Sequence, residues 1–382
     1  MVKIYLLPAG IGDFIWVRFG EGDTTDHNIL IDGGPAKFSR LYSHVLKLIA
    51  ADNQKTLIIL THIDADHIQG AAQGIANMSN EVVEQIVDKI YLNTGRGIKK
   101  AQSINEEQLG GDATCLPEDQ VVVYDNNPNH SVRDAETFLQ MIDRKGMNSK
   151  LIDYTTLGTE ADYEGAKLRF ISPGKRELLA LLNNWEEYKR RETIHYTARR
   201  ILDYEDITVL KNRNLGYDSS VTNRSSLAFL FEFEDIHGAF LGDAVASVMY
   251  DGLKEFGLSK PIVLDFVKLP HHGGKYNMSD RLISQLRSQN YLISTEGVPE
   301  ANVPSKVLVA HLVKNYEKNN SLISMPAIRL LSNYNWWSDT YKNMFFTDED
   351  IRSFIDTGIV EIVRLSDKPI IIKNNLELYN MF

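Results

Sequence analysis

Short apolar runs separated by turn residues dominate the first 75 positions of the chain. Ile4–Leu7 and Phe14–Phe19 flank a glycine-rich turn, which predicts a β-hairpin. Asn28–Ile31 predicts a third strand, and apolar residues at helical spacing predict a helix over Ser39–Ala51. The continuous apolar run Thr56–Leu60 is typical of a strand that is buried on both faces. The pattern therefore indicates an α/β fold.

The pattern changes between about residues 93 and 215. Two helical patterns, Ser131–Lys145 and Pro173–Asp203, enclose a strand pattern near Lys167–Ile171. Strands and helices alternate again afterwards. The predicted strands are Leu227–Phe233, Ala239–Leu241, Ile262–Lys268, Tyr291–Ser294, Ile359–Arg364 and Pro369–Ile372, and the predicted helices are Ser279–Ser288 and Ser305–Lys318. We expect one domain over 1–310, interrupted by a largely helical insertion at about 93–215, and a C-terminal extension over 311–382 that packs on this core.

Composition narrows the function classes. Hydrophobic residues make up 43% and charged residues 24% of the 382 residues, as in ordinary globular proteins. The net charge of −10 argues against a generally basic nucleic-acid binder, although it leaves room for a local basic patch. The single cysteine excludes an internal disulfide and a thiolate zinc cluster. Any bound metal must therefore be held by histidine and carboxylate.

The N-terminal segment is apolar only in short runs, which Pro8 and two glycines interrupt. It predicts strands and not a signal peptide. No apolar run approaches the roughly 18–20 residues that a membrane helix needs. We expect a cytoplasmic protein without a membrane partner.

The segment His62-x-Asp64-x-Asp66-His67 places four metal-ligating side chains within six residues, directly after a buried strand. Strand ends are where layered α/β folds usually build their sites. Two further clusters follow predicted strands, namely Asp243 and His271-His272-Gly273-Gly274. Taken singly, they fit a solvated acidic loop, a helix N-cap at Asp243 and an incidental histidine pair. Together they favour a site for zinc, manganese or iron.

The order Asp-Gly-Gly, His-x-Asp-x-Asp-His, Gly-Asp, His-His-Gly resembles the metallo-β-lactamase superfamily. More narrowly, the chain is similar to the hydrolase domain of ComEC-type competence DNA-uptake channels and their stand-alone relatives. Three segments carry this likeness, Gly10-Ile11-Gly12-Asp13, Asn223-Arg224-Ser225-Ser226-Leu227 and Lys268-Leu269-Pro270-His271-His272-Gly273. The likeness covers about 1–95 and 215–310. It implies an α/β, four-layer αββα sandwich with one or two divalent metal ions at one edge.

The resemblance also implies a role for each residue that matches a family position. Asp32 matches an acidic residue that orients the metal ligands, and Asp243 matches a carboxylate that bridges two metals. His271 matches the last histidine ligand, with His272 as the alternative between which the sequence does not choose. The implied metal ligands are His62, Asp64, Asp66, His67, Asp243 and His271.

The chain departs from the family pattern at the first metal position. A middle histidine ligand should precede the strand that begins at Ser225, and Thr222 and Asn223 occupy that place. A His-Pro pair found in ComEC-like domains is replaced by Asn302-Val303-Pro304-Ser305. The first position is therefore expected to be weak or to take manganese in preference to zinc, and a single ion is the alternative.

The Asp-rich ligand set favours hard ions and phosphoryl chemistry. The hypothesis is a phosphodiesterase or nuclease in which a metal-bound hydroxide attacks in line. Asp66 or Asp64 would orient the hydroxide, and His272 or Lys275 would stabilise charge or protonate the leaving oxygen. Two alternatives are hydrolysis of a small phosphoester or cyclic nucleotide, and a metal-poor binding or regulatory component of a multi-protein system, for example in defence.

Two regions are candidates for partner contact. The segment Pro173–Leu202 contains seven basic residues and interleaved aromatics, which could contact the phosphate backbone of DNA or RNA. A solvated helix face is the alternative. The C-terminal region is rich in aromatic residues, which suit either a protein partner or the core. These are Tyr334, Trp336, Trp337, Tyr341, Phe345 and Phe346.

Overall fold

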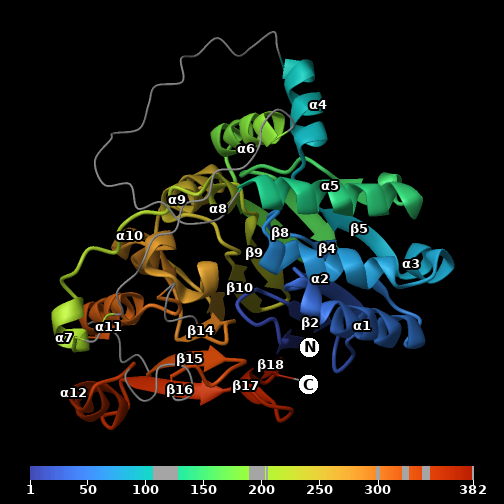
Figure 1. Cartoon of the computed structure of the whole chain (residues 1–382). Helices are drawn as coiled ribbons and strands as arrows, with labels where there is room; N and C mark the ends of the chain where they lie inside the picture. The colour runs from blue at the N-terminus through green and yellow to red at the C-terminus, as the bar shows by residue number, and fades with distance from the viewer. Residues whose placement is uncertain are drawn as a thin grey trace.

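The computed structural model describes residues 1–105, 128–188, 203, 205–297, 302–320, 327–337 and 345–380 (Figure 1). Within these residues, strands gather into two large mixed sheets of eight strands each, with a two-stranded sheet beside them. The mixed α/β class expected from the sequence is confirmed.

The first sheet has the strand order β17-β18-β1-β2-β3-β4-β5-β6. Its first three strands along the chain pair antiparallel, and the strands from β3 to β6 pair parallel. The bounds are β1 Val2–Leu6, β2 Ile15–Phe19, β3 His27–Ile31, β4 Lys55–Ile59, β5 Val87–Tyr91, β6 Leu151–Ile152, β17 Ile370–Lys373 and β18 Leu376–Tyr379.

The second sheet has the order β16-β15-β14-β12-β10-β9-β8-β7. It is antiparallel from β7 to β10 and parallel from β10 to β16. The bounds are β7 Glu160–Tyr163, β8 Ala166–Ser172, β9 Ala228–Phe233, β10 Ile236–Phe240, β12 Phe266–Lys268, β14 Asn290–Ile293, β15 Ile328–Ser332 and β16 Val360–Arg364. The small sheet pairs β11, Ile262–Val263, with β13, Leu286–Arg287.

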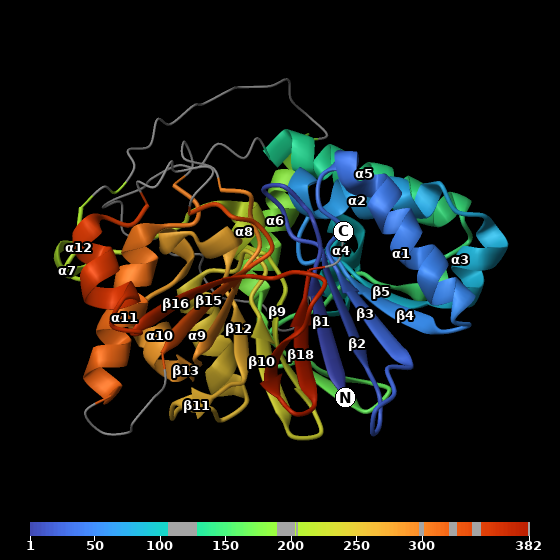
Figure 2. The same cartoon turned by 90° about the horizontal axis from the view of Figure 1, so that it is seen from below.

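Helices pack on both sheets, as Figure 2 shows from below. One apolar cluster joins α1, α2, α3, α5 and α6 to the first sheet, and another joins α9, α10 and α11 to the second. The helix bounds are α1 Ser39–Ala51, α2 Ala65–Ala76, α3 Asn80–Ile86, α4 Gly95–Asn105, α5 Pro128–Arg144, α6 Lys175–Tyr188, α7 Ile207–Leu210, α8 Val221–Arg224, α9 Ala246–Glu255, α10 Asp280–Gln285, α11 Lys306–Asn320 and α12 Asp348–Asp350.

A third apolar cluster joins residues of the two sheets to each other. In β4, Leu57 and Ile59 belong to this cluster, whereas Ile58 belongs to the cluster under the helices. Alternate side chains of a strand point to opposite faces, so a strand buried on both faces needs apolar residues at every position. This burial explains why the sequence shows a continuous apolar run here.

The structure places strands in the two regions that the sequence analysis set apart from the core. The described part of residues 93–215 contains the expected strand as β8, and it also supplies β6 to the first sheet and β7 to the second. The division expected at residue 310 falls inside α11. The chain beyond it supplies β15 and β16 to one sheet and β17 and β18 to the other, so its strands extend both sheets.

The predicted strand Ile262–Lys268 is also divided, since β11 and β12 lie in different sheets. Between them, the Leu264 backbone N–H donates to the carbonyl of Arg287, and the Asp265 N–H donates to that of His237. The backbone thus changes its pairing partner within two residues.

The structure describes much of the aromatic C-terminal region but little of the basic segment. Trp336, Phe345 and Phe346 are buried in the apolar cluster of the second sheet, as the core interpretation expects. The predicted helix Pro173–Asp203 is present as α6 up to Tyr188. Residues 189–202 and Tyr341, with most of the basic positions considered for nucleic-acid contact, lie outside the described residues. Within the described chain, each helix is too short or too polar to cross a bilayer.

Candidate metal centre

The three ligand-rich segments follow the carboxyl ends of one strand of the first sheet and two strands of the second. His62 follows β4, Asp243 follows β10, and His271 and His272 follow β12. β10 and β12 are parallel neighbours in the second sheet, which brings the residues after them to the same edge. The motif expected to form a loop is instead half helical, because α2 begins at Ala65 and carries Asp66 and His67 in its first turn.

Asp243 lies at the centre of these segments. Its Oδ2 is 3.9 Å from the Nε2 atoms of His62, His271 and His272, and its Oδ1 is 3.6 Å from Nε2 of His67. The alternative role of Asp243 as a helix N-cap does not hold, because Val245 occupies the N-cap of α9. One carboxylate thus faces four imidazoles.

A compact group of three residues lies on one side of Asp243. Asp66 Oδ2 is 3.4 Å from His272 Nε2 and 3.8 Å from His67 Nε2. The ligand atoms of Asp66, His67 and His272 all lie within 4.8 Å of one another, close enough to share one ion. We call this set the second position.

His62 and Asp64 form a looser pair, with 3.5 Å between Nε2 and Oδ2. Both oxygens of Asp64 also have hydroxyl donors, Ser131 Oγ at 2.6 Å and Thr222 Oγ1 at 3.1 Å. Ser131 belongs to α5, so the segment 93–215 reaches the site. We call His62 and Asp64 the first position.

Each of the four histidines presents Nε2 to the cluster and holds Nδ1 against an acceptor. Nδ1 of His67 donates to Asp32 Oδ2 at 2.8 Å, and Nδ1 of His272 donates to the carbonyl of Ser294 at 3.1 Å. Nδ1 of His271 donates to Asn277 Oδ1 at 2.9 Å. A hydrogen bond of this kind fixes the tautomer in which Nε2 carries the lone pair that binds a metal.

His62 is oriented through a relay. Thr61 Oγ1 donates to Asp32 Oδ2 at 2.8 Å and therefore accepts from Nδ1 of His62 at 3.0 Å. Asp32 also accepts from the Thr61 backbone N–H at 2.7 Å. It thus contacts the supports of both His62 and His67, as the orienting role expected for it requires.

Buried atoms without hydrogen-bond partners mark the centre of the cluster. They include Nε2 of His62, His67 and His272 and Oδ1 of Asp243. Leaving several buried polar atoms unsatisfied is unfavourable, and such atoms require an explanation. A divalent cation coordinated by three imidazoles and a carboxylate would satisfy them together, so these residues fit a metal.

The charges of the cluster are strongly coupled. Burial would raise the pKa of Asp243 and of Asp66, but the surrounding imidazoles hold both below the usual range. Burial opposes protonation of His272, yet Asp243, Asp13 and Asp66 raise its pKa to about 9. In the same way, Asp243 raises the pKa of His271, and Asp243 and Asp32 raise that of His67. Bound metal would therefore compete with protons for these nitrogens.

Asp13 and Lys268 form a supporting pair that the sequence did not reveal as such. Their side chains make a buried ion pair, and Asp13 Oδ1 lies 3.4 Å from Nδ1 of His272. Gly12 lets this turn approach α2, since a Cβ there would meet the Asp66 carbonyl oxygen at 1.8 Å. The Gly-x-Gly-Asp turn marked Asp13 in the sequence, but Lys268, its ion-pair partner, lies 255 residues further along the chain.

The opening of the cluster is on the side of Asp66 and His271. Their side chains are 24% and 14% exposed, compared with 0–5% for the other five residues of the cluster. A substrate would therefore reach the cluster past these two side chains.

Lys275, predicted to act on the leaving group, is placed beside another carboxylate. Its Nζ is 3.6 Å from Asp203 Oδ2, and Asp203 also accepts from Arg213 and Asn302. An ammonium group held there is engaged in a local charge network. A catalytic role for Lys275 stays a prediction.

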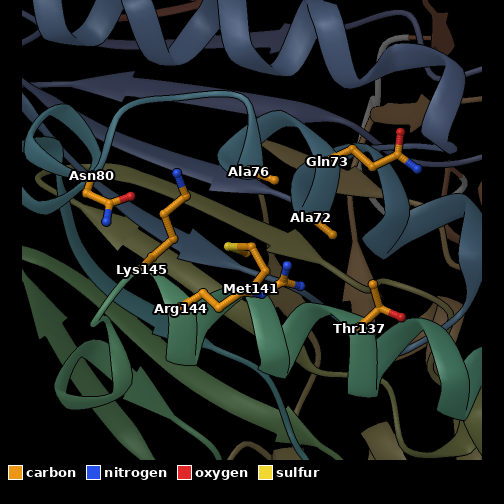
Figure 3. A pocket seen from close by; sticks show the side chains of 8 residues that line it. All are labelled: Ala72, Gln73, Ala76, Asn80, Thr137, Met141, Arg144 and Lys145. Atoms are coloured by element: carbon orange, nitrogen blue, oxygen red, sulfur yellow. The ribbon is translucent and has the colours of Figure 1, made fainter.

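A separate cavity of about 290 Å³ lies between α2 and α5 (Figure 3). Its lining comes from the end of α2, from α3 and from α5, and includes no residue of the metal cluster. The lining residues are Ala72, Gln73, Ala76, Asn80, Thr137, Met141, Arg144 and Lys145.

Comparison with known proteins gives no family assignment. No protein-family model and no curated protein matches the chain. Solved structures overlap it weakly. CmlA, a diiron β-hydroxylase from Streptomyces venezuelae, has a TM-score of 0.35 at 12% identity, and a CmlA mutant has 0.35 at 11%. Each match covers 95% of this chain and 52% of CmlA, so the chain spans about half the length of that protein.

A protein of unknown function from Enterococcus faecalis V583 has a TM-score of 0.30 at 11% identity, over 94% of this chain and 87% of its own. These TM-scores are too low to establish a common fold.

Proposed function

We propose that the protein is a metal-dependent hydrolase of the metallo-β-lactamase type that cleaves a phosphodiester bond. The observation that carries this proposal is the set of buried, unsatisfied Nε2 atoms that converge on Asp243. The motif order supports the superfamily. So do two facing mixed sheets with helices on each, which we take to be its four-layer αββα sandwich.

The choice of phosphodiester chemistry rests on the ligand set. Three aspartates and four histidines, without a thiolate, suit harder divalent ions such as manganese as well as zinc. A bound divalent ion lowers the pKa of water to about 7 and polarises the phosphoryl oxygen. The resemblance to ComEC-type hydrolase domains supports the same class of substrate.

The surroundings of the two aspartates proposed to orient the attacking water differ, and this difference supports Asp66 for the role. Both oxygens of Asp64 already accept from hydroxyl groups, those of Ser131 and Thr222. Asp66 is the more exposed and lies at the opening of the cluster. Asp66 would therefore orient the water, and Asp64 would serve as a ligand beside His62 at the first position.

The test is hydrolysis by the purified full chain after chelation and reloading. Manganese, zinc, magnesium and nickel are added in turn to assays with bis(p-nitrophenyl) phosphate, with DNA and with RNA. Activity that depends on added metal and is lost in Asp66→Ala supports the proposal. Asp251→Ala is the matched control, because Asp251 is exposed on α9 and pairs only with Lys254 among the described contacts. Inactivity with all four metals and all substrates contradicts the proposal.

A small phosphoester is the second candidate substrate. The contact from Ser131 of α5 to Asp64 brings part of residues 93–215 against the site, which favours a confined substrate. Cyclic nucleotides assayed beside the polymers separate the two. Faster cleavage of the cyclic nucleotide, with activity insensitive to salt, favours the small substrate, because polymer binding through phosphates weakens steeply with salt.

A further inference from the structure

The backbone at His271 and His272 is unusual. Their φ angles are +47° and +56°, and Gly273 follows at +84°. Residues other than glycine rarely adopt positive φ, and two histidines in succession lie in an unfavourable region. Such strain persists only where surrounding contacts impose it, and it is concentrated at functional sites.

This turn gives both neighbouring side chains access to one carboxylate. Nε2 of His271 and Nε2 of His272 are each 3.9 Å from Asp243 Oδ2. Their rings are nearly perpendicular, at 76°. In a strand, adjacent side chains point to opposite faces, so the left-handed turn is what lets both reach the cluster.

The Nδ1 atoms of the two histidines have different hydrogen-bonding and charged neighbours. His272 donates to the Ser294 carbonyl and lies beside Asp13. His271 donates to Asn277 and has Asp218 Oδ2 at 3.4 Å from its Nδ1. Asp218 is completely buried, and the side chains of Asn223 and Asn277 donate to it at 2.8 and 2.9 Å. A buried carboxylate behind an imidazole is the usual support of a metal-binding histidine.

The first position lacks a metal ligand that His271 can supply. Thr222, where a family histidine would be expected, donates to Asp64, and Asn223 donates to Asp218. His62 and His271 approach the same atom, Asp243 Oδ2, each at 3.9 Å. Two atoms this far apart can bind one ion, since twice a usual metal–nitrogen or metal–oxygen distance is about 4.2 Å.

We propose that the adjacent histidines serve different metal positions, His271 the first and His272 the second. His271 replaces the donor missing at 222–223 and completes a set with His62, Asp64 and Asp243. The inference rests on the proposed function in one respect, namely that the cluster binds metal.

The test measures bound manganese in the full chain by equilibrium dialysis and elemental analysis, with electron paramagnetic resonance to detect coupling between ions. His271→Asn removes the imidazole, and asparagine tolerates a left-handed backbone. His271→Gly removes both the imidazole and the steric cost of positive φ. His237→Asn, on an exposed histidine of β10, is the matched control.

We expect two equivalents in the wild type and in His237→Asn, and one equivalent without ion–ion coupling in both His271 variants. The lost equivalent should bind at least about 100-fold more weakly, since even supporting residues alter affinity by 10- to 100-fold. Double variants identify the metal position that His271 serves. His271→Asn with Asp64→Asn should retain the second ion, whereas His271→Asn with Asp66→Asn should lose both.

Unchanged affinity for every ion in both folded His271 variants overturns the inference and leaves the proposed function standing. Loss of both ions in the His271→Asn, Asp64→Asn protein, with circular dichroism as in the wild type, also overturns it. A wild type that binds no manganese, zinc or nickel overturns the proposed function itself.

Discussion

The two metal positions proposed here differ in how far the protein arranges them in advance. At the second position, the ligand atoms of Asp66, His67 and His272 lie within 4.8 Å of one another. At the first, His62 lies as close to His67 and Asp243, but Asp64 and His271 stand outside such a compact group of described residues, with Asp64 3.5 Å from His62 and His271 3.9 Å from Asp243. A preorganised ligand set binds with less loss of conformational freedom. The second position should therefore bind first and more tightly.

The difference follows from the elements that carry the ligands. Asp66 and His67 belong to the first turn of α2, which is packed closely against the Asp-Gly-Gly turn. The Gly33 N–H donates to the His67 carbonyl, and a Cβ at Gly70 would meet the Gly33 carbonyl oxygen at 1.9 Å. His62 and Asp64 precede the helix and depend on side-chain contacts from distant segments. Ligands on rigid elements are held more accurately than ligands on loops.

The largest expected effect comes from the residue that both positions share. Asp243→Asn keeps the side-chain volume and removes the bridging charge, so we predict loss of both metal ions and a fall in hydrolysis of roughly 1000-fold or more. Metal analysis and single-turnover rates measure this. Asp251→Asn should match the wild type. Retention of two tightly bound ions in Asp243→Asn would remove the basis for a shared ligand.

A pair of substitutions tests the difference between the positions directly. We predict that Asp66→Asn lowers the rate roughly 100-fold and removes the tightly bound ion, whereas Asp64→Asn lowers the rate only about tenfold and weakens the other ion. The reason is that Asp66 is in the closed set and lies at the opening of the cluster. Metal titrations of the two variants measure the order. Equal losses, or a larger loss in Asp64→Asn, would reverse the comparison.

Asp32→Asn should affect both positions without removing a ligand. Asp32 accepts from His67 and from the Thr61 hydroxyl that supports His62. We predict a loss of 10- to 100-fold in metal affinity, the range for residues that orient ligands. Saturating metal should restore most of the activity. Asp162→Asn, at an exposed position of strand β7, is a control with the same charge change. An unchanged dissociation constant would show that Asp32 does not orient the ligands.

The smallest effect concerns the stability of the metal-free protein. His272 has a folded-state pKa raised to about 9 from an ordinary value near 6.5, so its contribution to stability is complete below about pH 6.5 and is lost as pH rises toward 9. Asp66 and Asp243, whose pKa values are lowered, act oppositely and contribute above about pH 4. We predict a melting temperature of the chelated protein that falls between pH 6.5 and 9, by the equivalent of 1–3 kcal/mol in order of magnitude.

Thermal melts of chelated and manganese-loaded protein across this range provide the measurement. The loaded protein should lose the dependence, because metal replaces the proton on His272. If both forms had the same flat profile, protons and metal would not be competing for this nitrogen.

The contiguous motif made part of the site predictable. His62 to His67 stand within six residues after an apolar strand, and Gly33 of the Asp-Gly-Gly turn is needed for the close approach of α2. The start of α2 was not predicted, because Asp64 and Asp66 suggested a loop and two glycines interrupt the helical pattern. The bounds of α1 agree with the sequence pattern because its apolar face is regular.

The supporting residues were less predictable, since each belongs to a remote segment with no local signal. Asp218 and Asn277 become recognisable only when they are seen against His271, and Ser131 only against Asp64. The choice between His271 and His272 could not be made because sequence does not show the left-handed turn that directs both toward Asp243. β15 and β18, which extend the two sheets, were not predicted, because the aromatic residues of the C-terminal region gave no strand pattern there.

Anomalous diffraction from crystals of the full chain loaded with manganese tests the central claim most directly. We predict two anomalous peaks, one on each side of the Asp243 carboxylate, with the peak beside Asp66, His67 and His272 the stronger. The absence of any peak within bonding distance of these nitrogens, in crystals whose protein was saturated with metal, would contradict the account.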